Sequence, residues 1–264
     1  MGDNMEFKIG DLVTRNSHGN DIVFKITKID ADTCELVGKN VRLLVDAKIE
    51  DLKSYTGDDI ENEESFLKRT YQKETLNRDD YFYLPGKILH IDSDSDYLKR
   101  CLDYYKNINI WAMGINEREE NIAKNILKWL NEYKPNILVI TGHDAYYQKK
   151  GSLDDIEAYK NSKYYVNAIK KAREYEKSHE KLIIIAGGCG SCYEQLITAG
   201  ANFASSPKRI NIHALDPAII AGKMSLSDIN KDINLKEILD KTKYGKDGMG
   251  GIITKGTMYV GYPR

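Results

Sequence analysis

Two loops near the middle of the chain carry the residue types that cysteine-based peptide hydrolysis requires. His143 follows the apolar run 137–141, and Cys189 follows the run 181–186 and two glycines. A cysteine nucleophile needs a histidine that supports its thiolate and later protonates the leaving amine. If the two runs are neighbouring strands of a parallel sheet, their ends lie about 5 Å apart and the two side chains can meet. The sequence therefore predicts a catalytic dyad of Cys189 and His143.

The backbone around the two candidates offers donors for an oxyanion. Gly187 and Gly188 allow the chain to approach a substrate carbonyl closely. A helix expected to begin just after Cys189, at about residue 191, would favour the thiolate with its positive end. We expect the Cys189 amide to be one oxyanion donor and the amide of Asp144 or Gly142 to be the second.

Cys189 and Cys192 form a Cys-x-x-Cys pair, which leaves two other roles open. Such a pair can be redox active or can supply half of a metal site. However, no second Cys/His pair lies at ligand spacing, and the tryptophan and proline that flank a thioredoxin pair are missing. We therefore expect no metal and no cofactor. The residue types do not decide firmly between Cys189 and Cys192 as nucleophile.

Other polar residues near strand ends could have structural roles rather than catalytic ones. Asp92 and Asp94 end the run 87–92, where acids commonly cap the following helix. His90 lies inside that run, and His213 is a candidate third member of the site. Asp92 would be the phosphorylated acid if the domain were a non-catalytic, receiver-like binding module. That alternative expects a lysine at a later strand end, and residues 187–189 supply none.

From about residue 81 onward, strand patterns alternate with helix patterns. Short apolar runs indicate strands, and apolar residues at helical spacing indicate helices after each of them. Such alternation predicts a parallel sheet with helices on both faces. The predicted fold class is therefore α/β. The expected strands are 87–92, 108–114, 137–141 and 181–186, and the expected helices begin near 94, 116, 160 and 191.

The first 55 residues have a different pattern. Short strand candidates separated by tight turns predict a small SH3-like β-barrel over 1–55, in which no residue looks catalytic. A charge-dense segment with few apolar residues, 56–80, is expected to be a linker to the α/β domain at 81–264. The strand candidates are 7–15, 22–26, 33–38 and 41–45.

The bulk composition excludes several classes of protein. A formal net charge of -1 gives no general electrostatic attraction to nucleic acid. No apolar run reaches the ~18 residues that span a bilayer, and no signal peptide is visible. Four cysteines in 264 residues are too few for a disulfide framework. We therefore expect a cytoplasmic protein without membrane insertion, and nothing indicates an oligomeric state.

The order of the two candidates resembles the caspase–hemoglobinase type of cysteine peptidase. In that type a histidine after one strand precedes a cysteine after the next, and here Cys189 follows His143 by 46 positions. This chain differs from the type at two positions. It has Asp144 where glycine is common after the histidine, and Gly187 where arginine-cutting members often carry an acid.

Three longer segments resemble the YabG family of sporulation-specific proteases. They are KIGDLVTR at 8–15, TGHDA at 141–145 and GANFASSPKRINIHALDP at 200–217, and the resemblance extends along nearly the whole chain. It implies a cysteine endopeptidase that cleaves spore coat and related proteins after arginine in the mother cell, with Cys189 and His143 as its dyad. It also implies protein substrates as partners and an association with the forming spore coat.

Specificity for arginine requires a buried carboxylate that pairs with the guanidinium group. Gly187 cannot supply one. Asp92, at the end of the first strand of the α/β domain, is therefore expected to bind the substrate, with Asp216 and then Asp144 as alternatives. An enzyme with this specificity is also expected to cut its own linker at Arg69 or Arg78.

Overall fold

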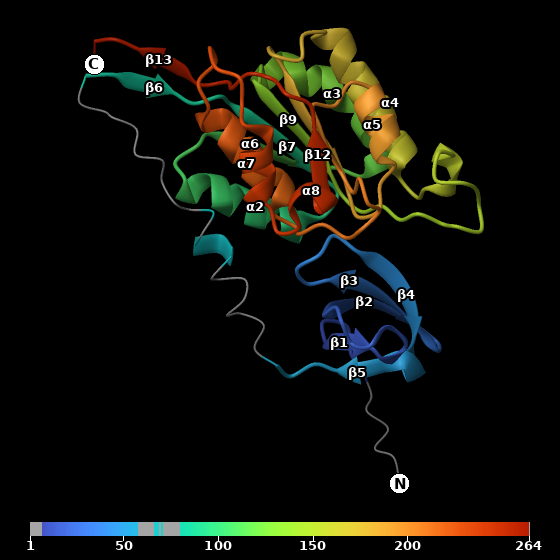
Figure 1. The fold of residues 1–264 in the computed structure, drawn as a ribbon. Coiled ribbons are helices and arrows are strands. Elements are labelled where there is room, and N and C mark those ends of the chain that lie inside the picture. The colour runs from blue at the N-terminus through green and yellow to red at the C-terminus, as the bar shows by residue number, and fades with distance from the viewer. Residues whose placement is uncertain (1–6, 58–65, 69, 71–79, 264) are drawn as a thin grey trace.

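The computed structural model describes residues 7–57, 66–68, 70 and 80–263. Within these residues the chain forms an N-terminal antiparallel sheet and a larger α/β part (Figure 1). The larger part is built on a mostly parallel sheet covered by helices. The predicted α/β class is therefore confirmed, and a separate N-terminal unit made of strands is confirmed with it.

The N-terminal sheet has five strands in the order β4-β3-β2-β1-β5. Alternating apolar side chains such as Val13, Phe24, Ile26 and Leu36 point to one side and form its core. The predicted strand at 41–45 is partly wrong, because pairing with β3 begins only at Leu44. The strands are β1 (Leu12–Arg15), β2 (Phe24–Asp30), β3 (Thr33–Gly38), β4 (Leu44–Lys48) and β5 (Leu52–Ser54).

The larger sheet has six strands in the order β12-β11-β10-β9-β7-β8. All neighbours are parallel except β12, which runs antiparallel to β11. The four strands expected from the apolar runs are present, with the second shifted a few residues later. The strands are β7 (Ile88–Asp92), β8 (Ala112–Asn116), β9 (Ile137–Thr141), β10 (Ile183–Gly187), β11 (Phe203–Ser205) and β12 (Met249–Gly251).

Both faces of this sheet are buried, which explains why its strands are continuous apolar runs rather than alternating ones. Ile137, Val139 and Ile183 face a core that contains residues of α2 and α6. Leu138 and Ile140 face a second core formed with α3, α4 and α5. The helices are α2 (Ser95–Asn107), α3 (Glu119–Tyr133), α4 (Ser162–Tyr175), α5 (Tyr193–Thr198) and α6 (Asp216–Leu226).

Besides β11, α6 and β12, several further elements were not indicated by the sequence patterns. They are α7 (Leu235–Asp240), α8 (Gly245–Gly248), and a small sheet in which β6 (Phe82–Leu84) pairs with β13 (Tyr259–Gly261). Among the helices in the described ranges, none is long and apolar enough to cross a membrane.

The expected linker at 56–80 is described only in part. Phe66 is buried and packs edge-on against His213, with ring centroids 4.9 Å apart. At this point the segment is anchored to the α/β part. Arg69 and Arg78, the predicted sites of self-cleavage, lie outside the described residues.

Arg173 on α4 ties this helix to the strands beneath it. Its guanidinium donates to the Gly200 and Leu182 carbonyls at 2.8 and 2.9 Å and to Asn202 Oδ1 at 2.7 Å. Asn202 Oδ1 in turn accepts from the Ile184 amide of β10. The arginine therefore fixes where α4 lies relative to β10 and β11.

We expect Arg173→Ala to lower the free energy of unfolding by about 2–4 kcal/mol, because several partly buried acceptors lose a charged donor. Lys171→Ala removes an exposed ion pair with Glu174 on the same helix and should cost about 0.5 kcal/mol or less. Urea unfolding of both variants and the wild type measures the difference. Equal losses in the two variants would contradict the assigned role of Arg173.

Candidate active site

The two candidate catalytic residues follow neighbouring strands. β9 and β10 pair in parallel, with Thr141 opposite Gly187. His143 and Cys189 each lie two residues beyond that last pair. The expectation that the two apolar runs are adjacent strands is confirmed, and both loops emerge at the same edge of the sheet.

The Asp144 carboxylate joins the two loops. Its Oδ2 accepts a hydrogen bond from Ser191 Oγ at 2.8 Å, and its Oδ1 accepts from the amides of Ala145 and Asn161. Asp144 is 1% exposed, and burial raises the pKa of its carboxyl group. The sequence suggested the Asp144 amide as an oxyanion donor and its carboxylate as the third choice for binding arginine, so the role of this carboxylate in joining the two loops was missed.

Gly188 brings the backbones of the two loops into direct contact. A Cβ atom at this position would lie 2.6 Å from the Gly142 carbonyl oxygen and 3.0 Å from the Asp144 amide nitrogen. No side chain fits there. Gly187, immediately before it, has a φ of +111°, which is outside the usual range of L-residues. The two glycines therefore allow the cysteine loop to pack against the histidine loop.

The His143 ring is held from one side only. Its Nε2 lies 3.1 Å from Asp94 Oδ2, whereas its Nδ1 is buried and has no hydrogen-bond partner in the described structure. Asp94 Oδ1 caps α2 by accepting from the amides of Asp96 and Tyr97, which confirms the expected cap. Burial disfavours the charge of the Asp94 carboxylate, but the hydrogen bonds from His143 and Tyr97 outweigh this effect and lower the pKa of Asp94. Because capping already explained this acid, its contact with His143 was missed.

Cys189 is 1% exposed, and its sulfur contacts the backbone of Ile212. Its Sγ accepts from the Ile212 amide at 3.3 Å and lies 3.8 Å from the Ile212 carbonyl oxygen. Burial raises the pKa of the Cys189 thiol to about 12, although the hydrogen bond from the Ile212 amide and the positive charge of Arg42 oppose the rise. The sulfur is therefore a protonated thiol at neutral pH in this conformation.

The expected help from a helix end at Cys189 is not found. α5 begins at Tyr193, and Cys192 occupies its N-cap position. Between Gly188 and Cys192 the chain forms a loop that is stabilised by Ser191. A hydrogen bond from the Gly188 amide to Ser191 Oγ, 2.9 Å long, closes this loop and delays the start of the helix.

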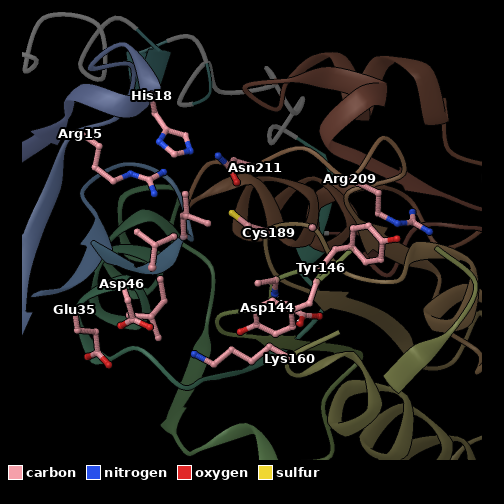
Figure 2. Close-up of a pocket in the computed structure, with 16 residues that line it drawn as sticks. Arg15, His18, Glu35, Asp46, Asp144, Tyr146, Lys160, Cys189, Arg209 and Asn211 are labelled. Atoms are coloured by element: carbon pink, nitrogen blue, oxygen red, sulfur yellow. Dashed lines mark hydrogen bonds between the residues drawn. The ribbon is translucent and has the colours of Figure 1, made fainter. Parts of the chain in front are cut away.

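Cys189 lines a cleft of about 560 Å³ between the N-terminal sheet and the α/β part. Figure 2 shows Cys189 with Arg15 and His18 on one side and Asp144 and Tyr146 on the other. Cys192 is buried elsewhere, in a small cluster with Ala158 and Tyr159. No group of three His, Cys, Asp or Glu side chains in the described ranges is arranged to hold a metal ion.

Asp92, the first choice for an arginine-binding acid, is fully buried and already paired. Its Oδ2 lies 2.6 Å from Arg42 Nη1 and accepts from Thr141 Oγ1 at 2.8 Å. Burial alone would raise the pKa of Asp92, but the charge of Arg42 and the neighbouring His90 ring, 3.6 Å away, hold it well below its usual range. The partner is an arginine of the same chain, contributed by the loop between β3 and β4.

Asp216, the second choice, is also fully buried, but no cationic side chain among the described residues is bonded to it. Its two oxygens accept from the amides of His213 and Lys243 at 3.0 and 2.8 Å. Burial raises the pKa of Asp216 to about 7 and lowers the pKa of the neighbouring His213 to about 3. Asp216 thus begins α6 and fixes two loops by their backbone.

Comparisons with known proteins cover almost the entire chain. The family model described as YabG peptidase U57 matches residues 8–263. The sporulation-specific protease YabG of Bacillus subtilis (strain 168) is 39% identical over 290 residues, an alignment that covers 98% of this chain and 99% of that protein.

Asp216 should make the folded state less stable as the pH rises. Its pKa is about 7 in the folded state against about 3.8 when exposed, so between these values only the folded state keeps the proton. The free energy of unfolding then falls by up to about 1.4 kcal/mol per pH unit from about pH 4 to about pH 7. Asp216→Asn should remove this contribution to the pH dependence of the free energy of unfolding.

Urea unfolding of the wild type and Asp216→Asn at several pH values measures the effect. Asp103→Asn, at an exposed position on α2, controls for the loss of one negative charge. A difference in stability between the wild type and Asp216→Asn that stays constant from pH 4 to pH 7 would contradict the assignment.

Proposed function

The chain belongs to the YabG peptidase family U57, and we propose that it is a cysteine endopeptidase with Cys189 as nucleophile and His143 as its acid–base partner. The observation that carries the proposal is the adjacency of their two loops. The loops follow paired strands, touch at Gly188 and are joined by the bond from Ser191 to Asp144. A sulfur and an imidazole carried on such loops can exchange a proton.

The contacts of His143 suggest how the proton moves. Asp94 occupies Nε2, so Nδ1 is the nitrogen left to act on Cys189. Nδ1 takes the proton of the thiol as the sulfur attacks the substrate carbonyl carbon. The tetrahedral intermediate then collapses, the C–N bond breaks, and the same proton passes to the leaving amine. Water hydrolyses the resulting thioester by the reverse sequence of proton transfers.

The oxyanion of that intermediate requires two backbone donors. The amide of the nucleophile itself, Cys189, is the first proposed donor. For the second, the position of Gly188 favours the Asp144 amide over that of Gly142. The Asp144 nitrogen faces Gly188, whereas Gly142 presents its carbonyl oxygen there.

We also propose a finer fold for each part of the chain and a class of substrate. The order of histidine and cysteine on adjacent strands supports a caspase–hemoglobinase-like domain over 81–264, and the five-stranded antiparallel sheet supports an SH3-like barrel over 1–55. A protease acts on protein substrates. We assign spore coat and related proteins, cleaved after arginine in the mother cell, from the family resemblance, and the Bacillus relative is itself a sporulation-specific protease.

A non-catalytic, receiver-like role finds no support in the site. A phosphorylated acid must be reachable by its phosphate donor. Asp92, the candidate acid, has no exposed surface and is paired with Arg42.

Single substitutions test the dyad. We expect Cys189→Ala and His143→Ala each to lower kcat/KM by about 1,000-fold or more, because the nucleophile or its proton acceptor is lost. Cys192→Ala is the matched control and should keep most of the activity, since that sulfur lies outside the cleft. The assay follows fluorescence release from a peptide with arginine before the cleaved bond, beside the same peptide with citrulline. Full activity of Cys189→Ala, or equal cleavage of both peptides, would refute the corresponding part of the proposal.

Asp94→Asn tests the positioning of the histidine. Asparagine still caps α2, so the free energy of unfolding should change by less than about 1 kcal/mol. We expect kcat to fall by about 10- to 100-fold with little change in KM, and the pH–kcat profile to move to lower pH, because the imidazolium loses its carboxylate partner. Asp96→Asn, two residues along the same helix, should leave the profile in place. An unchanged pH profile in Asp94→Asn would limit Asp94 to its capping role.

A further inference from the structure

The loop between β3 and β4, residues 39–43, leaves the N-terminal sheet and lies along the α/β part. We call it the docking loop. The Arg42 amide donates to the Ile212 carbonyl at 3.2 Å, and the Ala214 amide donates to the Asn40 carbonyl at 3.2 Å. Val41 and His213 form an isolated antiparallel bridge between these two bonds. The docking loop thus adds a short antiparallel strand to the segment that follows the proposed nucleophile.

This pairing is how an extended peptide binds to a protein edge. Main-chain hydrogen bonds at alternate residues hold the peptide, and the side chains between them enter pockets. Here Asn40 and Arg42 are held through their backbones by the stretch from Ile212 to Ala214. Arg42 occupies the place of a substrate residue whose side chain is recognised.

The Arg42 side chain fills a complete guanidinium site and has no exposed surface. Nη1 lies 2.6 Å from Asp92 Oδ2, and both Nε and Nη2 donate to the Ala214 carbonyl, at 3.1 and 2.8 Å. The Tyr97 ring lies 5.1 Å from the guanidinium carbon, and Cys101 Sγ lies 3.6 Å from Nη2. A carboxylate, a carbonyl and an aromatic face are the groups that select arginine over other side chains.

Arg42 also lies beside the nucleophile of the proposed mechanism. The positive charge of Arg42, together with the Ile212 amide, lowers the pKa of the Cys189 thiol against the effect of burial. Ile212 bridges the two residues, since its carbonyl accepts from Arg42 and its amide donates to Cys189 Sγ. The main chain at Arg42 and the sulfur that would attack a substrate are therefore both bonded to the backbone of Ile212.

The docking loop is not extended beyond Arg42 as a cleavable substrate would be. The Leu43 amide donates back to the Val41 carbonyl at 2.9 Å, so the chain turns at once. The Tyr97 hydroxyl donates to the carbonyls of Gly38 and Val41 and holds the turn in place. The peptide bond after Arg42 is thus folded back into the N-terminal sheet.

We propose that the docking loop is an internal, substrate-like inhibitor, and that Arg42 fills the subsite for the arginine of a protein substrate. Cleavage of another protein then requires the N-terminal sheet to withdraw this loop. An incoming arginine replaces Arg42 on Asp92, so the buried carboxylate is paired in both states. The inference rests on the proposed function, because it takes Cys189 as the nucleophile and arginine as the residue recognised.

Two substitutions release the loop in different ways. Arg42→Ala removes the competing guanidinium, and we expect kcat/KM for a short arginine peptide to rise by about 10-fold or more, as the fraction of enzyme with an open site increases. Tyr97→Phe keeps the ring but removes the hydroxyl that holds the turn, and should give a smaller rise. Lys25→Ala breaks an exposed ion pair between the N-terminal sheet and Asp96, outside the subsite, and should leave kcat/KM unchanged.

A second measurement reports on the sulfur itself. The rate at which iodoacetamide alkylates Cys189, followed by mass spectrometry of the peptide that contains it, should rise in the order wild type, Tyr97→Phe, Arg42→Ala. Circular dichroism checks that each variant is folded. If Arg42→Ala does not fold, Tyr97→Phe decides by both measurements.

The outcomes separate this inference from the proposed function. Folded variants with unchanged or lower kcat/KM and unchanged alkylation would overturn the inhibitory role, while an inactive Cys189→Ala would leave the protease assignment intact. Activity that survives in the double variant Arg42→Ala/Cys189→Ala would instead overturn Cys189 as nucleophile. If kcat/KM rises in Arg42→Ala and the added Cys189→Ala substitution abolishes all activity, both the inhibitory role of the docking loop and the nucleophile assignment are supported.

Discussion

A carboxylate buried at the end of β7 determines how the two parts of this molecule fit together. Asp92 has no exposed surface, and a buried charge is tolerated only when it is paired and hydrogen-bonded. Within the α/β part Asp92 receives bonds from Thr141 and the Asp94 amide, but the countercharge comes from Arg42 of the docking loop. Removing one partner of such a pair typically costs about 3–5 kcal/mol. The docking of the N-terminal sheet is therefore coupled to the charge of a residue beside the proposed active site.

The three buried aspartates among the described residues at this edge of the sheet are compensated in three different ways. Asp92 is matched by a full positive charge, and its pKa falls. Asp144 is surrounded by hydroxyl and amide donors and Asp216 by amides alone, and burial raises the pKa of each. The carboxylate with a cationic partner is thus the one suited to bind a guanidinium. The other two use their oxygens to fix the loops that carry His143, Cys189 and His213.

The sequence patterns located the two central loops but not the residues that complete the site. Parallel strands are continuous apolar runs, so the ends of β9 and β10, with the glycines before Cys189, could be recognised. Asp94 could not be assigned beyond its capping role, because its contact with His143 joins residues 49 positions apart. Arg42 stands in the apolar run 41–45, which is typical of a strand. Only the bonds to Asp92 and Ala214 reveal that this stretch leaves its own sheet.

The burial of Cys189 also bears on the step at which its thiol loses the proton in the proposed mechanism. Burial keeps the sulfur protonated in the resting enzyme. A substrate that replaces the loop residue for residue would exclude water from the same place, so desolvation would continue to disfavour a free thiolate. The proton must then leave as the sulfur attacks, rather than in an earlier ionisation. Such a transfer requires a correctly oriented acceptor at that moment, which explains why His143 is held through Nε2 by Asp94 with Nδ1 left open.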